Sequence, residues 1–362
     1  MKPVLPKADV TGLRRKLLAW YRREARTLPW RGTKDPYSVW LSEVIFQQTR
    51  IEQGTPYFER FIARFPTVQS LADAREDDVL KLWEGLGYYS RARNLHRASK
   101  IIAYERHGRF PSSAAEWLEI PGVGRYTAGA IASIAYSERT PVVDGNVIRV
   151  LTRLHDIDTP ADSSGTIETL WRLAGDLVPV RNPGDFNQAL MELGSNVCTP
   201  RAPVCGDCPV ASHCKARARG VQLERPVRRE KKPPPHYDMV AAVIVSEGKY
   251  FIAKRPPNGL LGGLWEFPGN QVVSGENHSI ALRRTGRDLL GVTLRPGRLV
   301  ACVSHAYSHF RVTVNAYRCF VSKGQPSPCW HTESRWVSPD EFAHFAFPKA
   351  NLKILPMLTN ER

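Results

Sequence analysis

Four cysteines lie within one short stretch of the sequence. Cys198, Cys205, Cys208 and Cys214 are unevenly spaced, with one Cys-x2-Cys pair in the middle. Cysteine thiolates at such spacings hold metal centres. Structural zinc usually joins two Cys-x2-Cys pairs, whereas a single pair flanked by looser cysteines suits an iron–sulfur cube bound by four thiolates. The spacing therefore favours iron–sulfur and leaves zinc as the alternative.

A glycine-rich turn, Pro121-Gly-Val-Gly124, is a second stretch that could bind a ligand. The flanking residues predict a helical hairpin over about 114–137. Gly122 and Gly124 let a ligand approach the backbone, and the amides at a helix N-terminus suit a phosphate. An ordinary tight turn is the alternative. A dinucleotide site is disfavoured because the turn lacks a preceding strand and a third glycine.

The charge of the chain favours a polyanionic partner. Its 362 residues include 51 Lys and Arg against 35 Asp and Glu, a formal charge of +16. Nucleic acid is the first candidate and an anionic membrane surface the second. No apolar run approaches a membrane span, and residues 1–7 lack the apolar core of a signal peptide. We expect a cytoplasmic, nucleoid-associated protein whose seven cysteines are not disulfides.

The sequence divides into a part with helical patterns and a part with strand-like patterns. Residues 9 to about 197 read as short amphipathic helices, one of them starting at Asp35-Pro36. Residues 215–232 are rich in Lys and Arg, and prolines follow, which indicates a linker. Strand-like runs then appear at 239–245, 250–253 and 312–317. We predict an all-α domain (1–220), a basic linker (221–235) and an α+β domain (236–362).

The glycine hairpin followed by the cysteine cluster resembles the helix-hairpin-helix DNA glycosylases of the endonuclease III superfamily. This resemblance implies that the hairpin backbone grips DNA phosphates around a cation, with carbonyls from Leu118, Ile120 and Val123. Tyr126 stands where strand-cutting members carry a lysine nucleophile. A phenol cannot form a Schiff base, so we expect base removal without strand cleavage.

Further motifs resemble the adenine DNA glycosylase (MutY) family over essentially the whole chain. They are, in order, 28–31 (Leu-Pro-Trp-Arg), 42–49 (Ser-Glu-Val-Ile-Phe-Gln-Gln-Thr), 85–93 and 143–147 (Val-Asp-Gly-Asn-Val). The resemblance implies a 4Fe-4S cluster and a monomeric enzyme of base excision repair without membrane contact. Its substrate would be double-stranded DNA with adenine opposite 8-oxoguanine or guanine.

Removal of adenine has the needs of glycoside hydrolysis: an acid for the leaving group and an anion for the oxocarbenium-like sugar. By resemblance, Glu43 is the acid and then the base for water, and apolar neighbours would raise its pKa. Asp144 stabilises the sugar cation or attaches to it, and Tyr126 and Asn146 orient the pair. The alternative for Glu43 is an ordinary solvated surface glutamate. The alternative for Asp144 is a structural role in an Asx turn or helix cap.

Other DNA contacts follow from the same resemblance. Because a duplex hides the reacting atoms, the base must be flipped out, and Gln48, Tyr88 and Leu86 are candidates to fill the gap. Trp30, Arg31, Gln188 and Met191 would line the adenine pocket. Some family members carry Glu at the position of Gln188. The neutral Gln188 side chain cannot balance the positive charge of Arg31 as a glutamate would. The remaining expected DNA contacts are Arg26, Thr49, Gly87, Gly122 and Gly124.

Residues 269–292 resemble a degenerate Nudix box. Glu276 and Arg284 survive, but Thr285, Asp288 and Leu289 occupy glutamate positions. Too few carboxylates remain for magnesium, so we expect a Nudix-like domain without pyrophosphate hydrolysis. The loop Tyr307-Ser308-His309 matches the segment that reads 8-oxoguanine in the family, where Phe-Ser-His is usual.

Three other functions compete with this interpretation. An endonuclease III-like pyrimidine glycosylase with lyase action is disfavoured by Tyr126 and the second domain. A non-catalytic, redox-sensing DNA-binding protein is disfavoured by the pair Glu43 and Asp144. An active Nudix hydrolase fused to a DNA clamp would require magnesium-dependent cleavage of oxidised dGTP.

Overall fold

The computed structural model describes residues 7–229 and 233–359, which form two compact units. Unit 1 comprises Met1–Ala72 and Arg97–Lys231, and unit 2 comprises Asp73–His96 and Lys232–Arg362. Unit 2 is therefore discontinuous in the sequence. Residues 1–6, and residues 230–232 of the expected linker, lie outside the described part.

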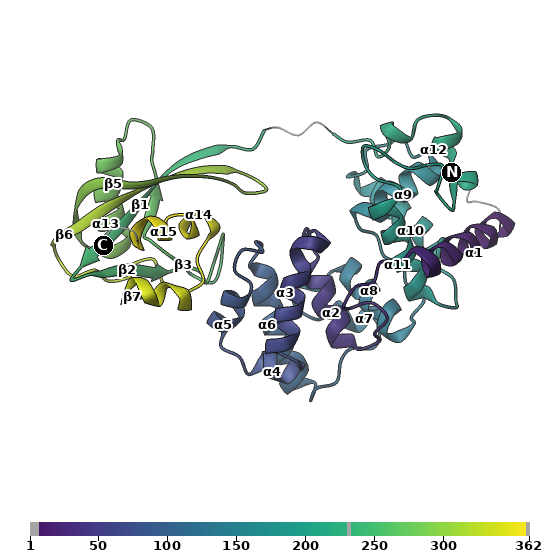
Figure 1. The fold of residues 1–362 in the computed structure, drawn as a ribbon, viewed down its shortest axis with the longest axis horizontal. Helices are drawn as coiled ribbons and strands as arrows, with labels where there is room; N and C mark the ends of the chain where they lie inside the picture. Colours follow the sequence, from purple (N-terminus) through teal and green to yellow (C-terminus); the bar gives the residue numbers. More distant parts are fainter. Residues whose placement is uncertain (1–6, 230–232, 360–362) are drawn as a thin grey trace. The chain divides into compact units, whose positions relative to one another are not determined.

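Unit 1 is helical, as the sequence predicts (Figure 1). Its elements are α1 (Lys7–Glu24), α2 (Pro36–Ile45), α3 (Ile51–Arg64), α4 (Val68–Ala72), η1 (Ile101–Glu105), α7 (Ala114–Trp117), α8 (Arg125–Tyr136), α9 (Gly145–His155), α10 (Ser164–Leu177), α11 (Pro183–Asn196), η2 (Ala211–His213), α12 (Lys215–Ala218) and η3 (Gln222–Glu224). Helix α6 (Ser90–Lys100) begins in unit 2 and ends in unit 1. None of the described helices is both long and apolar enough to cross a membrane.

Helix starts in unit 1 follow capping rules. Asp35 accepts hydrogen bonds from the amides of Tyr37 and Ser38, and Pro36 opens α2. The predicted hairpin over about 114–137 consists of α7 and α8, and α8 begins at Arg125 with Gly124 as its N-cap. Asp144, for which the sequence allowed an Asx turn or a helix cap, is the N-cap of α9. Backbone geometry thus places a carboxylate at the first turn of a buried helix.

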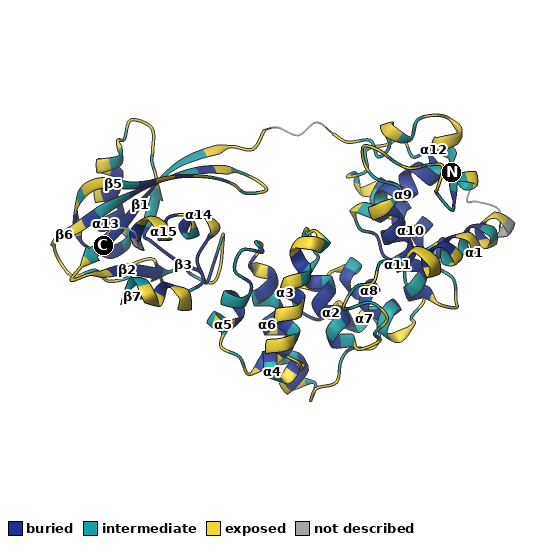
Figure 2. Cartoon of the chain, in the orientation of Figure 1, coloured by how far each residue is buried: buried dark blue, intermediate teal, exposed yellow. Residues whose placement is uncertain are grey.

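The core of unit 1 joins helices that are far apart in sequence. Leu13 and Leu17 of α1, Leu151 of α9 and Phe186 and Leu193 of α11 are almost fully buried in one cluster. Figure 2 shows dark, buried faces on α8, α9, α10 and α11. Cys198, Cys208 and Cys214 pack against the same cluster, so the cysteine loop rests on the helices that carry Asp144.

Unit 2 is built on a sheet, and the predicted strands at 239–245, 250–253 and 312–317 fall within it. Its order is β3-β2-β1-β6-β5, with β4 paired to β1 and β7 to β2; β1 and β6 are parallel. The elements are α5 (Glu76–Leu82), β1 (His236–Ser246), β2 (Lys249–Lys254), β3 (Trp265–Glu266), β4 (Gly269–Gln271), α13 (His278–Leu290), β5 (Thr293–Ala306), β6 (Arg311–Lys323), β7 (Glu333–Val337), η4 (Pro339–His344), α14 (Lys349–Leu352) and α15 (Leu355–Thr359).

Both faces of this sheet are covered, because side chains of a strand alternate between faces. Val240 and Ala242 of β1 pack with Leu282 of α13. Ala241 and Val243 belong to a second cluster with α14 and α15. The apolar run of β1 therefore reflects burial on both sides.

Residues 73–96 join unit 2 through polar contacts with its later part. Lys254 Nζ lies 2.6 Å from Asp77 Oδ1. Lys81 Nζ donates to the carbonyl of Phe345 at 2.9 Å, and the Phe347 amide donates to Glu84 Oε1 at 2.9 Å. Partners in this unit are thus more than 170 positions apart in the chain.

Candidate active site and nucleic-acid interface

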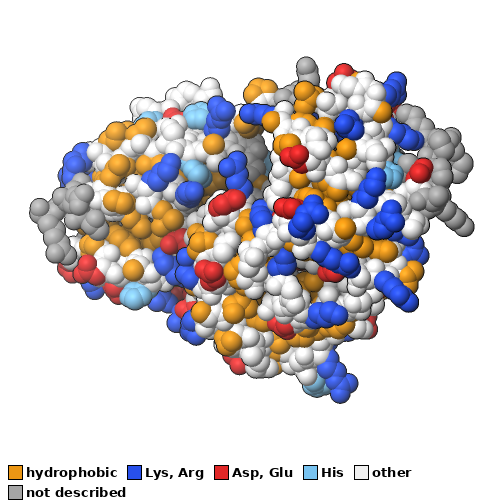
Figure 3. Space-filling model, turned by 45° about the vertical axis from the view of Figure 1, so that its right-hand side comes forward, with side chains coloured by type: hydrophobic (Ala, Val, Ile, Leu, Met, Phe, Trp, Pro, Cys, Tyr) orange, Lys and Arg blue, Asp and Glu red, His pale blue; other side chains and the backbone are white. Residues whose placement is uncertain are grey.

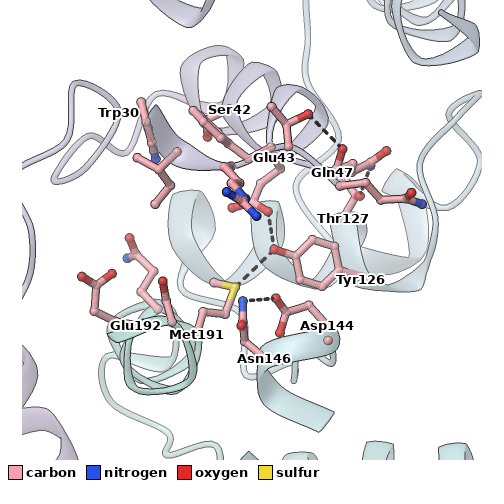
Figure 4. A pocket seen from close by; sticks show the side chains of 18 of the residues that line it. Trp30, Ser42, Glu43, Gln47, Tyr126, Thr127, Asp144, Asn146, Met191 and Glu192 are labelled. Carbon is pink, nitrogen blue, oxygen red and sulfur yellow. Dashed lines mark hydrogen bonds between the residues drawn. The ribbon is translucent and has the colours of Figure 1, made fainter. Parts of the chain in front are cut away.

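Unit 1 contains a cavity of about 1090 Å³, shown from close by in Figure 4. It is lined by the segment between α1 and α2, by α2 and the residues after it, by the glycine turn, and by the facing parts of α8, α9 and α11. The predicted residues Glu43, Tyr126, Asp144 and Asn146 all line it. Segments separated by a hundred residues thus converge on one space.

Tyr126 connects two sides of this cavity. Its hydroxyl donates to Glu43 Oε2 at 2.7 Å and lies 3.2 Å from the Met191 sulfur. Figure 4 shows the tyrosine ring reaching from α8, with Glu43 on one side and Met191 on the other. A phenol in this position holds a carboxyl group in place, and it has no amine for a Schiff base.

The environment of Glu43 suits a general acid. Burial raises its pKa to about 7, the Tyr126 hydrogen bond opposes that rise, and the Asp144 charge adds to it. A carboxyl group that titrates near neutral pH is protonated in a useful fraction of molecules and can still act as a base after losing its proton. The expected rise in pKa by desolvation is therefore found.

Asp144 is held by its own helix start. Its Oδ1 accepts the Val147 amide at 2.7 Å, and its Oδ2 accepts Asn146 Nδ2 at 3.0 Å. Burial raises the pKa of Asp144, and these hydrogen bonds and the nearby Arg149 oppose the rise by favouring the anion. The carboxylate is thus fixed in direction beside Glu43, with which it interacts electrostatically.

Arg149 links this helix start to the cysteine loop. Its Nη2 donates to Asn146 Oδ1 at 2.7 Å and to the Gly194 carbonyl at 2.6 Å, and its Nε donates to the Cys198 carbonyl at 2.7 Å. Arg149 was not among the residues predicted from the sequence. The sequence held one signal for it, because Arg149 falls on the apolar face of an amphipathic helix. The structure shows that Arg149 is indeed buried.

The structure brings most of the other predicted contacts of unit 1 to the cavity. The Trp30 ring packs against the Phe46 ring in a tilted arrangement, with ring centroids 4.2 Å apart. Gln48 is exposed and has a left-handed backbone, with φ of 55°, a conformation that is uncommon for a residue other than glycine. The lining also includes Arg26, Arg31, Thr49, Gly122, Gly124, Gln188 and Met191.

The hairpin turn lies at the edge of this cavity. Gly122 has φ of 79°, and a side chain added at Gly124 would meet no atom within 4 Å. The backbone is therefore open to a ligand on this side. Of the three expected cation donors, Ile120 already accepts the Val123 amide at 3.1 Å, whereas the side chain of Leu118 is exposed.

The remaining predicted contacts belong to unit 2. Leu86 is only 6% exposed, so its side chain packs inside the protein, whereas Tyr88 is 36% exposed and has a left-handed backbone. The Tyr88 hydroxyl donates a hydrogen bond to Ser308 Oγ. Ser308 and His309 are exposed, while the Tyr307 ring stacks on Phe310 with centroids 4.7 Å apart. Gly87, beside Tyr88, has φ of 78°.

The four cysteines of the loop at 198–214 fit a shared metal centre. All four are free and partly buried. Burial, together with repulsion from the other three thiols, raises the pKa of the Cys208 thiol to about 11 against a hydrogen bond to the Val210 backbone, so the four thiols lie within electrostatic reach of one another. Arg153 Nη1 lies 3.3 Å from the Cys198 sulfur. In the described chain, no three His, Cys, Asp or Glu side chains are gathered closely enough for a single metal ion, and a four-iron cube spreads its thiolates more widely.

The residual Nudix box has no free acidic cluster among its described residues. Arg284 Nη2 and Nε bind both oxygens of Glu276, at 2.8 and 2.9 Å. Thr285 is buried and donates to the Ala281 carbonyl, and Asp288 pairs with Arg287. The surviving carboxylate is therefore neutralised by the surviving arginine.

The surface charge agrees with a polyanionic ligand. On the face shown in Figure 3, Lys and Arg side chains are more widespread than Asp and Glu side chains. Arg50, Arg125 and Arg228 stand among the residues that line the cavity. Such positive charge at a cavity favours the approach of phosphates.

Comparisons with known families agree with this architecture. Residues 41–175 match the model of the HhH-GPD superfamily of base excision DNA repair proteins, residues 198–214 match the iron–sulfur binding domain of endonuclease III, and residues 239–357 match the NUDIX domain. A structure of a thermostable thymine-DNA glycosylase is similar to 59% of this chain and 98% of its own, with a TM-score of 0.53 and 25% identity. The chain is thus a helix-hairpin-helix DNA glycosylase with a 4Fe-4S cluster and a Nudix-like domain.

Relatives that align with nearly the whole of this chain identify the family. The adenine DNA glycosylase of Rattus norvegicus is 36% identical over 98% of this chain and 79% of its own length, and that of Homo sapiens is 35% identical over 96% and 74%. The Schizosaccharomyces pombe protein is 30% identical over 95% and 89%. The chain belongs to the adenine DNA glycosylase family and is a hydrolase of base excision repair.

Proposed function

We propose that this enzyme removes adenine paired with 8-oxoguanine and leaves the strand uncut. The observation that carries the chemical part is the hydrogen-bonded pair of Glu43 and Tyr126 beside Asp144 in one cavity. An acid with a pKa near 7 and a separately held carboxylate meet the two needs of N-glycoside hydrolysis. The four cysteines would hold the cluster in the loop whose Cys198 carbonyl accepts a hydrogen bond from Arg149.

The reaction follows from these positions. Glu43 donates its proton to adenine N7, the C1′–N9 bond breaks with its electron pair going to the purine, and the sugar becomes an oxocarbenium ion. The Asp144 carboxylate stabilises that cation, either as an ion pair or by a transient bond to C1′. Glu43, now ionised, takes a proton from water, and the water oxygen bonds to C1′; if Asp144 has bonded to C1′, that bond breaks and its electron pair returns to the carboxylate. The products are free adenine and an abasic site, and Glu43 regains its proton.

A duplex carrying adenine opposite 8-oxoguanine tests this chemistry. We expect free adenine and a strand that breaks only after alkali treatment. Glu43→Gln keeps the shape but has no acidic proton to give, so the single-turnover rate is expected to fall about 10²- to 10⁴-fold, the range typical of general acid–base catalysis. Spontaneous nicking, or a variant that releases adenine at the wild-type rate, would contradict the proposal.

Unit 2 supports recognition of the opposite base. Ser308 is exposed at the tip of the loop between β5 and β6, and its hydroxyl is within reach of Tyr88. A hydroxyl can accept from N7–H and donate to O8 of oxidised guanine, groups that guanine lacks.

Ser308→Ala tests this assignment. The variant is expected to lose about tenfold of the preference for 8-oxoguanine over guanine opposite adenine, the worth of one or two hydrogen bonds. Single-turnover rates on the two duplexes provide the measurement. His309→Ala provides a comparison at the neighbouring exposed position, and an unchanged preference in Ser308→Ala would refute the role.

A further inference from the structure

A buried carboxylate between two arginines forms one wall of the catalytic cavity. Glu192 of α11 is only 2% exposed in its side chain, whereas its partners Arg26 and Arg31 are 31% and 18% exposed. All three residues line the cavity, and Figure 4 shows Glu192 on the same helix as Met191. The proposed mechanism gives none of them a step, so this wall needs its own explanation.

Every oxygen of Glu192 is occupied. Its Oε1 accepts Arg26 Nε at 2.6 Å and Asn196 Nδ2 at 2.9 Å, and its Oε2 accepts Arg31 Nη2 at 2.8 Å and Arg26 Nη2 at 3.1 Å. Charge-assisted bonds of this kind fix direction as well as distance. The carboxylate is thus an anchor with no free position for a ligand of its own.

The two arginines are held by this anchor and by each other. Arg31 Nη1 donates to the Arg26 carbonyl at 3.0 Å, and the Arg31 guanidinium lies over the Tyr21 ring at 5.4 Å. Arg26 Nη2 also reaches Ser195 Oγ at 3.2 Å. The Arg26 and Arg31 guanidinium groups share the Glu192 carboxylate, so these three side chains together carry a net charge of +1.

Helix α11 presents a second polar group to the same space. Gln188 lies one turn before Glu192, and both line the cavity, because residues four apart share a helix face. The amide of Gln188 is neutral and cannot offset Arg31. Glu192 supplies the carboxylate for that arginine from the next turn of the same helix.

We propose that Glu192 is a positioning residue of the base pocket, which holds Arg26 and Arg31 so that their donors and the Gln188 amide meet the acceptors of the extruded purine. Glu192 acts through the arginines and does not touch the base. This inference rests on the proposed function, since it assumes that adenine enters this cavity.

Two duplexes separate the pocket from the rest of the DNA interface. One carries 2′-fluoro-2′-deoxyadenosine opposite 8-oxoguanine, whose glycosidic bond resists cleavage; the other carries a tetrahydrofuran abasic analogue, which has no base. With Glu192→Gln holoenzyme, the Kd of the first duplex is expected to rise about tenfold, while that of the second stays within about twofold, because only the first places acceptors against the arginines. Glu192→Asp keeps the charge and is expected to recover part of the loss.

A double-variant cycle tests whether Glu192 acts through Arg31. If it does, Glu192→Gln and Arg31→Gln together weaken the base-containing duplex about as much as Arg31→Gln alone, a non-additive result. Asp176→Asn, at an exposed ion pair of α10 outside the cavity, is the control and should change neither Kd.

The outcomes are decisive in each direction. Equally weakened binding of both duplexes would assign Glu192 a structural role and overturn the proposal. Unchanged binding of both duplexes, or additive effects in the double-variant cycle, would overturn it as well. If Glu192→Gln does not fold, as judged by circular dichroism and iron content, Glu192→Asp carries the same comparison between duplexes. Adenine release by the wild-type enzyme is measured first, with the same preparation. If the wild-type enzyme releases no adenine, the proposed function itself is refuted.

Discussion

Two glutamates of one cavity have pKa values that shift in opposite directions. Burial raises the pKa of Glu43 to about 7, because one tyrosine hydroxyl only partly offsets the loss of water. Burial also raises the pKa of Glu192, but hydrogen bonds and charges from Arg26 and Arg31 outweigh it and lower the pKa to about 2. Identical side chains thus differ in their charge near neutral pH because their neighbours differ.

In the proposed mechanism, the hydroxyl of Tyr126 influences the alkaline limit of activity through its hydrogen bond to Glu43. Because it donates to the Glu43 anion, it lowers the pKa of that carboxyl. The proposed mechanism needs protonated Glu43, so we expect the rate to fall as the pH rises through about 7. Tyr126→Phe should raise the pKa, and the falling limb of kcat/KM against pH should move up by about 1 unit.

Tyr136→Phe is the matched control, since Tyr136 ends the same helix and does not line the cavity. Its pH profile should follow that of the wild type. A limb that moves to lower pH in Tyr126→Phe would contradict the assignment of Glu43 as the acid.

At the scale of elements, the site depends on how closely α9 and α11 approach. Arg149 ties the start of α9 to the end of α11 and to the cysteine loop. At the crossing, a Cβ added to Gly194 would lie 2.7 Å from the Asn146 Cβ and 3.0 Å from its carbonyl oxygen. The hydrogen atom that serves as the side chain of Gly194 thus sets the position of Asn146 and, through it, of Asp144.

Gly194→Ala should therefore be harmful although alanine favours helices. The backbone of α9 must move, so we expect a lower melting temperature, by the several degrees that correspond to about 1–3 kcal/mol of overpacking, and slower adenine release. Calorimetry and single-turnover kinetics check this. Gly175→Ala in α10, whose added Cβ would meet Pro141 at an ordinary 3.8 Å, should keep or raise stability. Equal melting temperatures in the two variants would argue against the crossing as the cause.

Local patterns were enough to predict the helix start at Pro36, the helical hairpin over about 114–137, the main strands and the cysteine cluster, because these depend on neighbours in the sequence. Glu192 was missed, since its partners Arg26 and Arg31 lie more than 160 positions away. One signal was present: a glutamate between Leu190 and Leu193, on a helix whose apolar spacing predicts burial. Charged residues at such positions are rarely buried unless they are paired.

At the scale of the whole molecule, the unit boundaries do not follow the sequence. The change in composition after residue 214 indicates a second domain, but it gives no sign that residues 73–96 belong with it. That grouping rests on contacts such as Lys254 with Asp77 and the Phe347 amide with Glu84. Pairings over such separations are set by the fold and have no periodicity to reveal them.

A chain ending at residue 229 tests this grouping. Residues 76–93 would lose their partners in unit 2, so their amides should exchange hydrogen at least about tenfold faster than in the full chain, as expected for a segment with weaker local stability. Exchange in α9, whose contacts lie within unit 1, is the internal control. Equal protection of residues 76–93 in both chains would show that the later residues do not stabilise them.

The discontinuity of unit 2 also affects synthesis. Residues 73–96 leave the ribosome well before Lys254, Phe345 and Phe347, their partners, have been translated. At about 5–20 residues per second, this segment waits on the order of ten seconds or more for its binding surface. During that interval the nascent chain displays polar groups that the finished enzyme pairs with residues made much later.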